Sequence, residues 1–146
     1  MPTTIADVRE FLAQRRIALV GVSRNPKDFS RMLFREMCDR GYDMVPVNPA
    51  VSEVESRRCF GRLQEIDPPA EGALVMTAPQ DTERVVRDCV EAGVRRVWMH
   101  RGGDKAPSVM RLPTSAIRTG YTWLKAIARS CFFPIRSLSI VYTGSC

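Results

Sequence analysis

The 146-residue sequence contains no long hydrophobic run, which limits where the protein can reside. Its longest strongly apolar stretch, residues 17–22, is too short to span a lipid bilayer. Residues 1–11 also lack the basic segment followed by an apolar segment that a signal peptide requires. We therefore expect a cytoplasmic protein with no membrane partner. A composition of 45% hydrophobic and 26% charged residues is typical of one folded domain with its own core.

Histidine and cysteine are too few and too scattered to form a metal site or a disulfide framework. The one histidine is His100, and no two cysteines have the CxxC spacing. No acid or nucleophile stands beside His100 in the sequence, which favours a structural role over a catalytic one. We predict no metal ligands, no catalytic residues, and free thiols at the five cysteines, Cys38, Cys59, Cys89, Cys131 and Cys146.

Acidic residues are nearly absent from the C-terminal part of the chain. Residues 1–101 contain 16 Lys and Arg against 15 Asp and Glu, whereas residues 102–146 contain 6 against 1. Most of the formal net charge of +6 therefore lies in the second segment. A basic segment suggests a nucleic-acid partner, but this one lacks interleaved aromatic residues and any nucleic-acid motif, so we expect none. We divide the chain into a domain of residues 1–103 and an atypical tail of residues 104–146.

The remaining sequence alternates between short apolar runs and segments of helical periodicity. Strand-like runs occur at residues 17–22, 43–47, 72–79 and 95–100, and helical spacing occurs over residues 3–12, 29–40, 62–66 and 80–92. This alternation is typical of a doubly wound α/β fold with a parallel sheet. Pro46 lacks a backbone donor, which places the second strand near a sheet edge. Ligands of such folds bind at the carboxyl ends of the strands, so a site is expected in the loops there.

The loop after the first apolar run contains residues that suit an anion. Gly21 lets a ligand approach the backbone closely, and Arg24 and Lys27 add positive charge. Backbone donors at a strand-to-helix turn, together with the helix N-terminus, favour phosphate. One glycine and two cations also fit a solvated loop whose basic side chains contact only water. From these residues alone, both interpretations stay open.

Two familiar nucleotide-binding motifs are missing. The sequence has no GxxxxGK[ST], and it has no GxGxxG because Ser23 stands where the second glycine would be. Asn48 and Pro49 occupy the place where an acid would bind the ribose of NAD. These features disfavour a nicotinamide dehydrogenase. An oxidoreductase or transferase that uses NAD(P) or another nucleotide, with Ser23 or His100 active, is kept as the alternative function.

Four segments taken in order resemble a known family. They are IALVGVSRNPKDFSRMLFREMCDRGYDMVPVNP, CFGRLQEI, GALVMTAP and GVRRVWMHRGG. They are similar to the stand-alone CoA-binding domain proteins, small Rossmann-like relatives of the CoA-binding domain of succinyl-CoA synthetase. The resemblance covers residues 8–103.

The resemblance implies a ligand and a site. The ligand is CoA or acyl-CoA, and because no general base, nucleophile or metal cluster accompanies the loop, we expect non-catalytic binding. The residues implied to hold the CoA phosphates are Gly21, Val22, Ser23, Arg24 and Lys27. Those implied to line the nucleotide pocket are Val47, Asn48, Pro49, Thr77, Ala78 and Pro79.

Beyond Gly103 the sequence departs from this family. Relatives usually continue with a helix, a fifth strand and a segment like GYCPFMF. When the codons are re-read from their third base, AIARSCFF can become YCPFMFF, so we interpret the tail as a frameshifted reading of an ordinary family C-terminus. A genuinely divergent tail is the alternative. Without a fifth strand, the fourth strand is expected to form an exposed edge and to lower the stability of the fold. The sequence does not indicate an oligomeric state.

Overall fold

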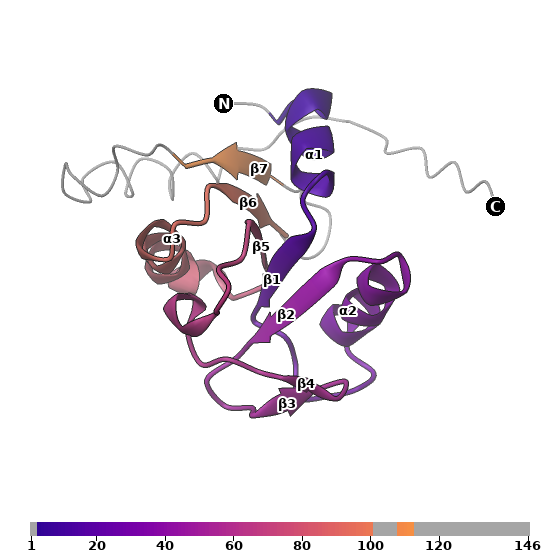
Figure 1. Ribbon diagram of the computed structural model, residues 1–146. Coiled ribbons are helices and arrows are strands. Elements are labelled where there is room, and N and C mark those ends of the chain that lie inside the picture. The colour runs from indigo at the N-terminus through magenta and orange to yellow at the C-terminus, as the bar shows by residue number, and fades with distance from the viewer. Residues whose placement is uncertain (1–2, 101–107, 113–146) are drawn as a thin grey trace.

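Five strands form one sheet at the centre of the structure, a computed structural model that describes residues 3–100 and 108–112 (Figure 1). The strand order is β2-β1-β5-β6-β7. The first four strands are parallel, and β7 runs antiparallel to β6. The predicted α/β fold with a parallel sheet is confirmed. The strand bounds are β1 Arg16–Val20, β2 Asp43–Val47, β5 Gly72–Val75, β6 Arg96–Met99 and β7 Ser108–Arg111.

Helices cover both faces of the sheet (Figure 1). Helix α3 (Thr82–Glu91) and the short 3-10 helix η1 (Leu63–Glu65) pack on one face, and α1 (Ile5–Leu12) and α2 (Phe29–Asp39) pack on the other. Phe11 of α1 is buried and contacts Trp98 edge to face, with 5.4 Å between ring centroids. Each fully buried apolar side chain of this size contributes about 1.5–3 kcal/mol. The helical spacing predicted over residues 80–92 is confirmed by α3, whose inward face buries Val85, Val86, Cys89 and Val90.

β2 is an edge strand of the sheet, as Pro46 predicts. The carbonyl of Pro46 accepts a hydrogen bond from Phe60 N at 3.0 Å, outside the ladder with β1. The N–H and C=O of one strand residue point to the same side, so the missing donor of Pro46 faces away from β1 and costs no ladder bond. Asn48 N donates back to Phe60 O at 2.9 Å. Phe60 therefore covers part of the outer edge of β2.

Residues 50–71 contain a hairpin that the sequence does not indicate. Strands β3 (Glu53–Val54) and β4 (Arg57–Arg58) pair antiparallel through a two-residue turn, Glu55 and Ser56. Both turn residues have positive φ, 50° and 62°. Such turns are normally marked by Asn-Gly or Asp-Gly, so a Glu-Ser pair gives no signal for a hairpin. Only the short helix of this region was predicted, and it is confirmed as η1.

The expectation that the fourth strand forms an exposed edge is wrong, because residues 108–111 of the tail form a further strand beside it. β7 pairs along the whole of β6, so β6 is not an exposed edge. Val109 N donates to Thr3 Oγ1 at 3.0 Å, and Leu112 is buried at 3% exposure. The low acid content that set the tail apart concerns its charge and does not determine whether a segment pairs as a strand. Residues 108–111 pair with β6, and the apolar Leu112 after them is buried. Residues 101–107 and 113–146, and with them the frameshift hypothesis, lie outside the described residues.

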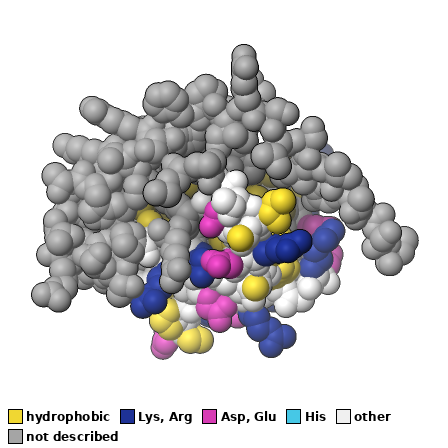
Figure 2. Space-filling model, turned by 90° about the horizontal axis from the view of Figure 1, so that it is seen from above, with side chains coloured by type: hydrophobic (Ala, Val, Ile, Leu, Met, Phe, Trp, Pro, Cys, Tyr) yellow, Lys and Arg dark blue, Asp and Glu magenta, His cyan; other side chains and the backbone are white. Residues whose placement is uncertain are grey.

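Figure 2 views the molecule from above the orientation of Figure 1, and the described part of that face carries charges of both signs. On the described part of this face, basic, acidic and hydrophobic side chains are interspersed rather than gathered by sign (Figure 2). Two ion pairs tie the amino ends of the strands to their neighbours, Arg16 with Asp43 and Arg96 with Glu10.

None of the helices within the described residues is long and apolar enough to cross a membrane.

Candidate functional site

The carboxyl ends of β1, β2 and β5 carry three loops that lie together at one edge of the sheet. We call them the first loop (residues 21–28), the second loop (residues 48–52) and the third loop (residues 76–78). Gly21 N donates to Val47 O at 3.0 Å, and Asn48 Nδ2 donates to Val22 O at 2.7 Å. The side chain of Asn48 therefore ties the second loop to the backbone of the first.

Gly21 is required where the first and third loops meet. Its φ is +87°, a left-handed conformation that favours glycine. A Cβ at this position would lie 2.9 Å from Thr77 Cγ2 and 3.0 Å from Thr77 N. Conformation and space therefore both exclude a side chain, and the two loops can pack directly against each other.

A pocket of about 170 Å³ opens between these loops, η1 and α3. Five of the eleven residues that the sequence assigned to a site line this pocket, namely Gly21, Val47, Asn48, Pro49 and Thr77. The hydroxyl Oγ1 of Thr77 is buried and has no hydrogen-bond partner among the described residues. A buried hydroxyl without a partner is costly, so this atom marks a place where a ligand donor or acceptor would be favourable.

The sequence analysis missed the part of the pocket that η1 and α3 supply. Gly61, Arg62 and Leu63 line it from the segment around η1, and Arg84, Val85 and Asp88 line it from α3. Asp88 is buried, and its carboxylate accepts from Arg62 Nη2 and from Gln64 Nε2, each at 3.0 Å. An acid among the apolar inward positions of α3 was the available signal, because a buried carboxylate requires partners.

Three backbone donors of the first loop are bonded to side chains of the loop and of α2. Ser23 N donates to Ser30 Oγ at 2.9 Å, Asn25 N to Ser23 Oγ at 3.1 Å, and Lys27 N to Asn25 Oδ1 at 3.0 Å. These N–H groups were expected to bind phosphate oxygens directly. In the structure they are already bonded, so an anion would have to displace these side chains or bind elsewhere on the loop.

A carboxylate occupies the N-terminus of α2. Asp28 is the N-cap residue and accepts from Ser30 N at 2.9 Å and from Ser30 Oγ at 2.6 Å. The hydrogen bonds from Ser30 lower the pKa of Asp28, so it carries a negative charge at neutral pH. The positive end of the helix dipole is therefore complemented by the protein itself.

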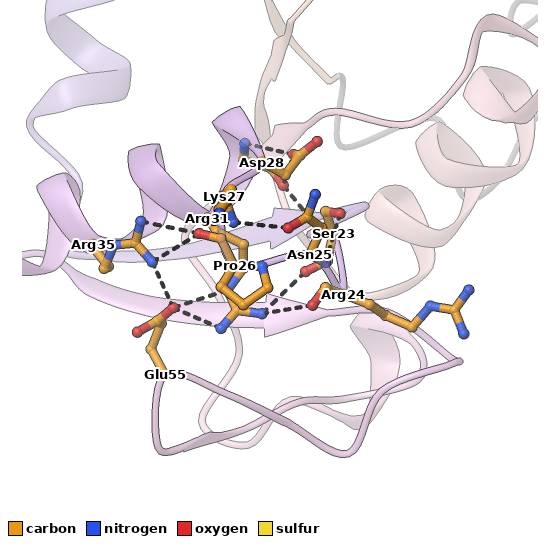
Figure 3. A network of polar contacts seen from close by, with 10 residues as sticks. Ser23, Arg24, Asn25, Pro26, Lys27, Asp28, Arg31, Arg35 and Glu55 are labelled. Carbon is orange, nitrogen blue, oxygen red and sulfur yellow. Dashed lines mark hydrogen bonds and ion pairs between the residues drawn. The ribbon is translucent and has the colours of Figure 1, made fainter.

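The side chains of Arg24 and Lys27 are what the first loop offers to an anion. Both residues are exposed, and neither forms an ion pair with any residue that the structure describes. Figure 3 shows the side chain of Arg24 extending away from the polar network that surrounds the loop. Arg31 and Arg35, in contrast, are engaged with Glu55 at 2.7 Å and 3.0 Å.

Six of the eleven residues assigned from the sequence do not line the pocket, namely Val22, Ser23, Arg24, Lys27, Ala78 and Pro79. Ser23, Arg24 and Lys27 lie on the first loop beside it. The side chain of Val22 is completely buried in the core, so only its backbone is available at the site. Ala78 and Pro79 are exposed, at the start of the 3-10 helix η2 (Pro79–Asp81), and do not line the pocket.

Within residues 3–100 and 108–112, neither a reactive thiol nor a metal site accompanies the pocket. The imidazole of His100 stacks on the ring of Phe29, with 5.2 Å between centroids and 28° between planes. Burial raises the pKa of the Cys59 and Cys89 thiols, which disfavours thiolates there. The described residues contain no group of three or more His, Cys, Asp or Glu side chains that could hold a metal ion.

Comparison with known proteins identifies the family. A family model described as the CoA binding domain matches residues 15–128. The chain belongs to the CoA-binding domain family. The match continues past Gly103, where we placed the end of the resemblance, and it supports the expected fold and family.

Relatives of this CoA-binding domain include small proteins and part of a larger enzyme. The uncharacterized protein YneT of Bacillus subtilis is 32% identical over 98 residues, which are 66% of this chain and 73% of that protein. The solved structure of a hypothetical protein from Pyrococcus horikoshii has a TM-score of 0.62 and 31% identity, covering 66% of this chain and 68% of the other. The alpha subunit of ADP-forming acetate–CoA ligase II from Pyrococcus furiosus is 26% identical over 94 residues, 64% of this chain but 21% of that subunit. The chain thus corresponds to about a fifth of the ligase subunit.

Proposed function

We propose that this protein binds CoA or acyl-CoA at the carboxyl edge of its sheet and catalyses no reaction there by itself. The observation that carries the proposal is the pocket wall at Thr77, where a buried hydroxyl lacks a partner in a domain of the CoA-binding family. A nucleotide base has donors and acceptors on the edge of a flat ring. Such an edge would satisfy the Thr77 hydroxyl while the ring contacts the apolar wall.

The size of the pocket favours one part of CoA over the whole molecule. Its volume of about 170 Å³ is smaller than the roughly 300–1,000 Å³ of pockets that enclose a drug-sized ligand. Apolar side chains of Val20, Val47, Leu63 and Val85 line it, as a flat base requires. We assign the base to this pocket, and the phosphates and the pantetheine arm to the exposed surface of the loops.

The charge of CoA fits the two exposed cations of the first loop. CoA carries a pyrophosphate and a 3′-phosphate, and both classes of phosphate are stabilised by charge-assisted hydrogen bonds. Arg24 and Lys27 can move toward a ligand without breaking an ion pair to a described residue. Arg62 and Arg84 line the pocket but are paired with Asp88 and Asp81, so we assign them a smaller part.

The contacts of Ser23 and His100, the two residues that the enzymatic alternative would use, support a role in binding without catalysis. Ser23 Oγ accepts from Asn25 N at 3.1 Å, within the turn of the first loop. His100 is stacked on Phe29. Neither arrangement resembles a nucleophile oriented by a neighbouring base, which is the geometry that nucleophilic catalysis needs.

Isothermal titration calorimetry tests the proposal. The protein is titrated in turn with CoA, acetyl-CoA, NADH, NADPH and ATP, and we expect heat of binding with CoA or acetyl-CoA. Arg24→Ala and Lys27→Ala should each weaken CoA binding about three- to tenfold, because an exposed charge-assisted contact is lost. Arg95→Ala is the matched control, since Arg95 is also exposed but precedes the amino end of β6. Binding of NADH or NADPH without any response to CoA would overturn the proposal.

A further inference from the structure

A single carboxylate joins the β3–β4 hairpin to helix α2 beside the first loop. Glu55 Oε1 accepts from Arg31 Nε at 3.0 Å and from Arg31 Nη2 at 2.7 Å. The same oxygen accepts from Arg35 Nη1 at 3.0 Å. Figure 3 shows Glu55 below the two guanidinium groups, with all three bonds converging on one atom.

The two guanidinium groups also hold the backbone of the first loop. Arg31 Nη1 donates to Ser23 O at 3.3 Å and to Arg24 O at 3.5 Å. Arg35 donates to Pro26 O through both Nη1 and Nη2, each at 3.2 Å. Glu55 is thus connected, through the two arginines, to three carbonyls of the loop that carries Arg24 and Lys27, those of Ser23, Arg24 and Pro26.

The backbone at Glu55 is unusual for this residue type. Glu55 and Ser56 have φ of 50° and 62°, a region that glycine, asparagine and aspartate adopt far more readily. Both values belong to the two-residue turn between β3 and β4, which fixes the backbone at Glu55 close to α2. Within the described residues, the contacts that its carboxylate makes are those to Arg31 and Arg35.

We propose that Glu55 is a positioning residue for CoA binding: through Arg31 and Arg35 it holds three carbonyls of the first loop toward α2, so that the loop presents Arg24 to the phosphates. This inference rests on the proposed function. Carbonyl oxygens facing a phosphate would repel it, so their direction matters to an anion site. The side chain of Arg31 is only 12% exposed, so it acts on the loop rather than on a ligand in solvent.

The sign of the expected effect separates positioning from simple electrostatics. Removing a negative charge near an anion site strengthens anion binding on Coulomb grounds alone. If Glu55 positions the loop, its removal weakens CoA binding instead. Glu53 provides the matched control, because it is exposed in the same hairpin and forms no ion pair with a described residue.

The experiment compares three variants of the full chain by calorimetric titration with CoA. Glu55→Gln keeps the length of the side chain and removes its charge, and we expect the Kd to rise about five- to tenfold. Glu55→Gly also removes the carboxylate but suits the positive φ, so it should keep the hairpin folded and weaken CoA binding at least as much. Glu53→Gln should change the Kd less than about twofold. Equal affinity in the wild type and both Glu55 variants would overturn the proposal, as would equal weakening by Glu53→Gln.

A second readout needs no ligand. The backbone amide resonances of Arg24 and Asn25 in the free protein should shift or broaden in both Glu55 variants and stay unchanged in Glu53→Gln. Unchanged resonances in the Glu55 variants would contradict positioning of the loop. If the wild type binds no CoA while these resonances respond as expected, the proposed function fails and the positioning of the loop by Glu55 stands.

Discussion

Replacing Thr77 by valine should make the protein more stable and a poorer binder at the same time. The Thr77 hydroxyl is buried and lacks a partner in the free protein, which costs about 1–3 kcal/mol. Valine has nearly the same shape and no hydroxyl, so most of that cost should disappear. For a chain of this length, each kcal/mol raises Tm by about 3 °C, so we expect an increase of about 3–9 °C.

The same substitution removes a hydrogen-bonding group from the pocket. A hydrogen bond to a bound ligand is worth about 0.5–1.5 kcal/mol, so the affinity for CoA should fall about two- to tenfold. Calorimetric unfolding and CoA titration on the same sample measure both effects. Thr82→Val is the control, because Thr82 is only partly buried, does not line the pocket, and should change neither quantity. A less stable Thr77→Val protein with unchanged CoA affinity would refute the argument, because the hydroxyl would then already be satisfied in the free state.

Two further predictions concern the first loop. Asp28→Asn should strengthen CoA binding about two- to fivefold, because asparagine caps a helix as well as aspartate and the loop loses a negative charge. The folded-state pKa of Asp28 is lowered, so its ionised form stabilises the fold at neutral pH. This stabilisation is lost as the pH falls through that pKa. The difference in unfolding free energy between the wild type and Asp28→Asn should therefore shrink in acid. Weaker binding by Asp28→Asn would show that a carboxylate is needed there. Gly21→Ala should lower the free energy of unfolding in urea by more than the roughly 1–2 kcal/mol that a left-handed backbone costs, and Gly41→Ala, with φ +90° and open space around its Cβ, should show that backbone cost alone.

Much of the fold could be predicted from the sequence because its signals are local. The continuous apolar runs gave the four parallel strands, and the helical spacing of Val85, Val86, Cys89 and Val90 gave the inward face of α3. The hairpin at Glu55 could not be predicted, because its turn uses residues that seldom adopt positive φ. β7 could not be predicted because the tail departs from the family pattern, and its short antiparallel pairing depends on contacts with β6 rather than on local pattern.

The sequence predicts where the candidate site lies, but it does not predict all the residues that line it or how they are hydrogen-bonded. The rule that ligands bind at the carboxyl ends of parallel strands places Gly21, Asn48 and Thr77 together, and the structure brings them to one pocket. The contributions of Arg62 and Asp88 depend on how η1 docks on α3, which no local spacing encodes. The internal bonding of the first loop was likewise hidden, because Ser, Asn and Asp side chains can serve either a ligand or their own backbone.

For the CoA site that we propose, side chains of the first loop are a better source of anion affinity than the three amides of that loop that are already bonded. Helix N-termini and loop amides bind phosphate well when they are free, but here Asp28 caps α2 and the amides of Ser23, Asn25 and Lys27 are already bonded. The remaining positive charge lies on exposed, flexible side chains, which water and salt screen and which lose entropy when a ligand fixes them. When Arg31 and Arg35 fix the loop backbone, the Arg24 side chain has fewer conformations in the free protein. It therefore loses less conformational entropy when a ligand binds. In the role that we propose for it, Glu55 orders this loop. Its carboxylate can therefore be negatively charged and still favour the binding of an anionic ligand.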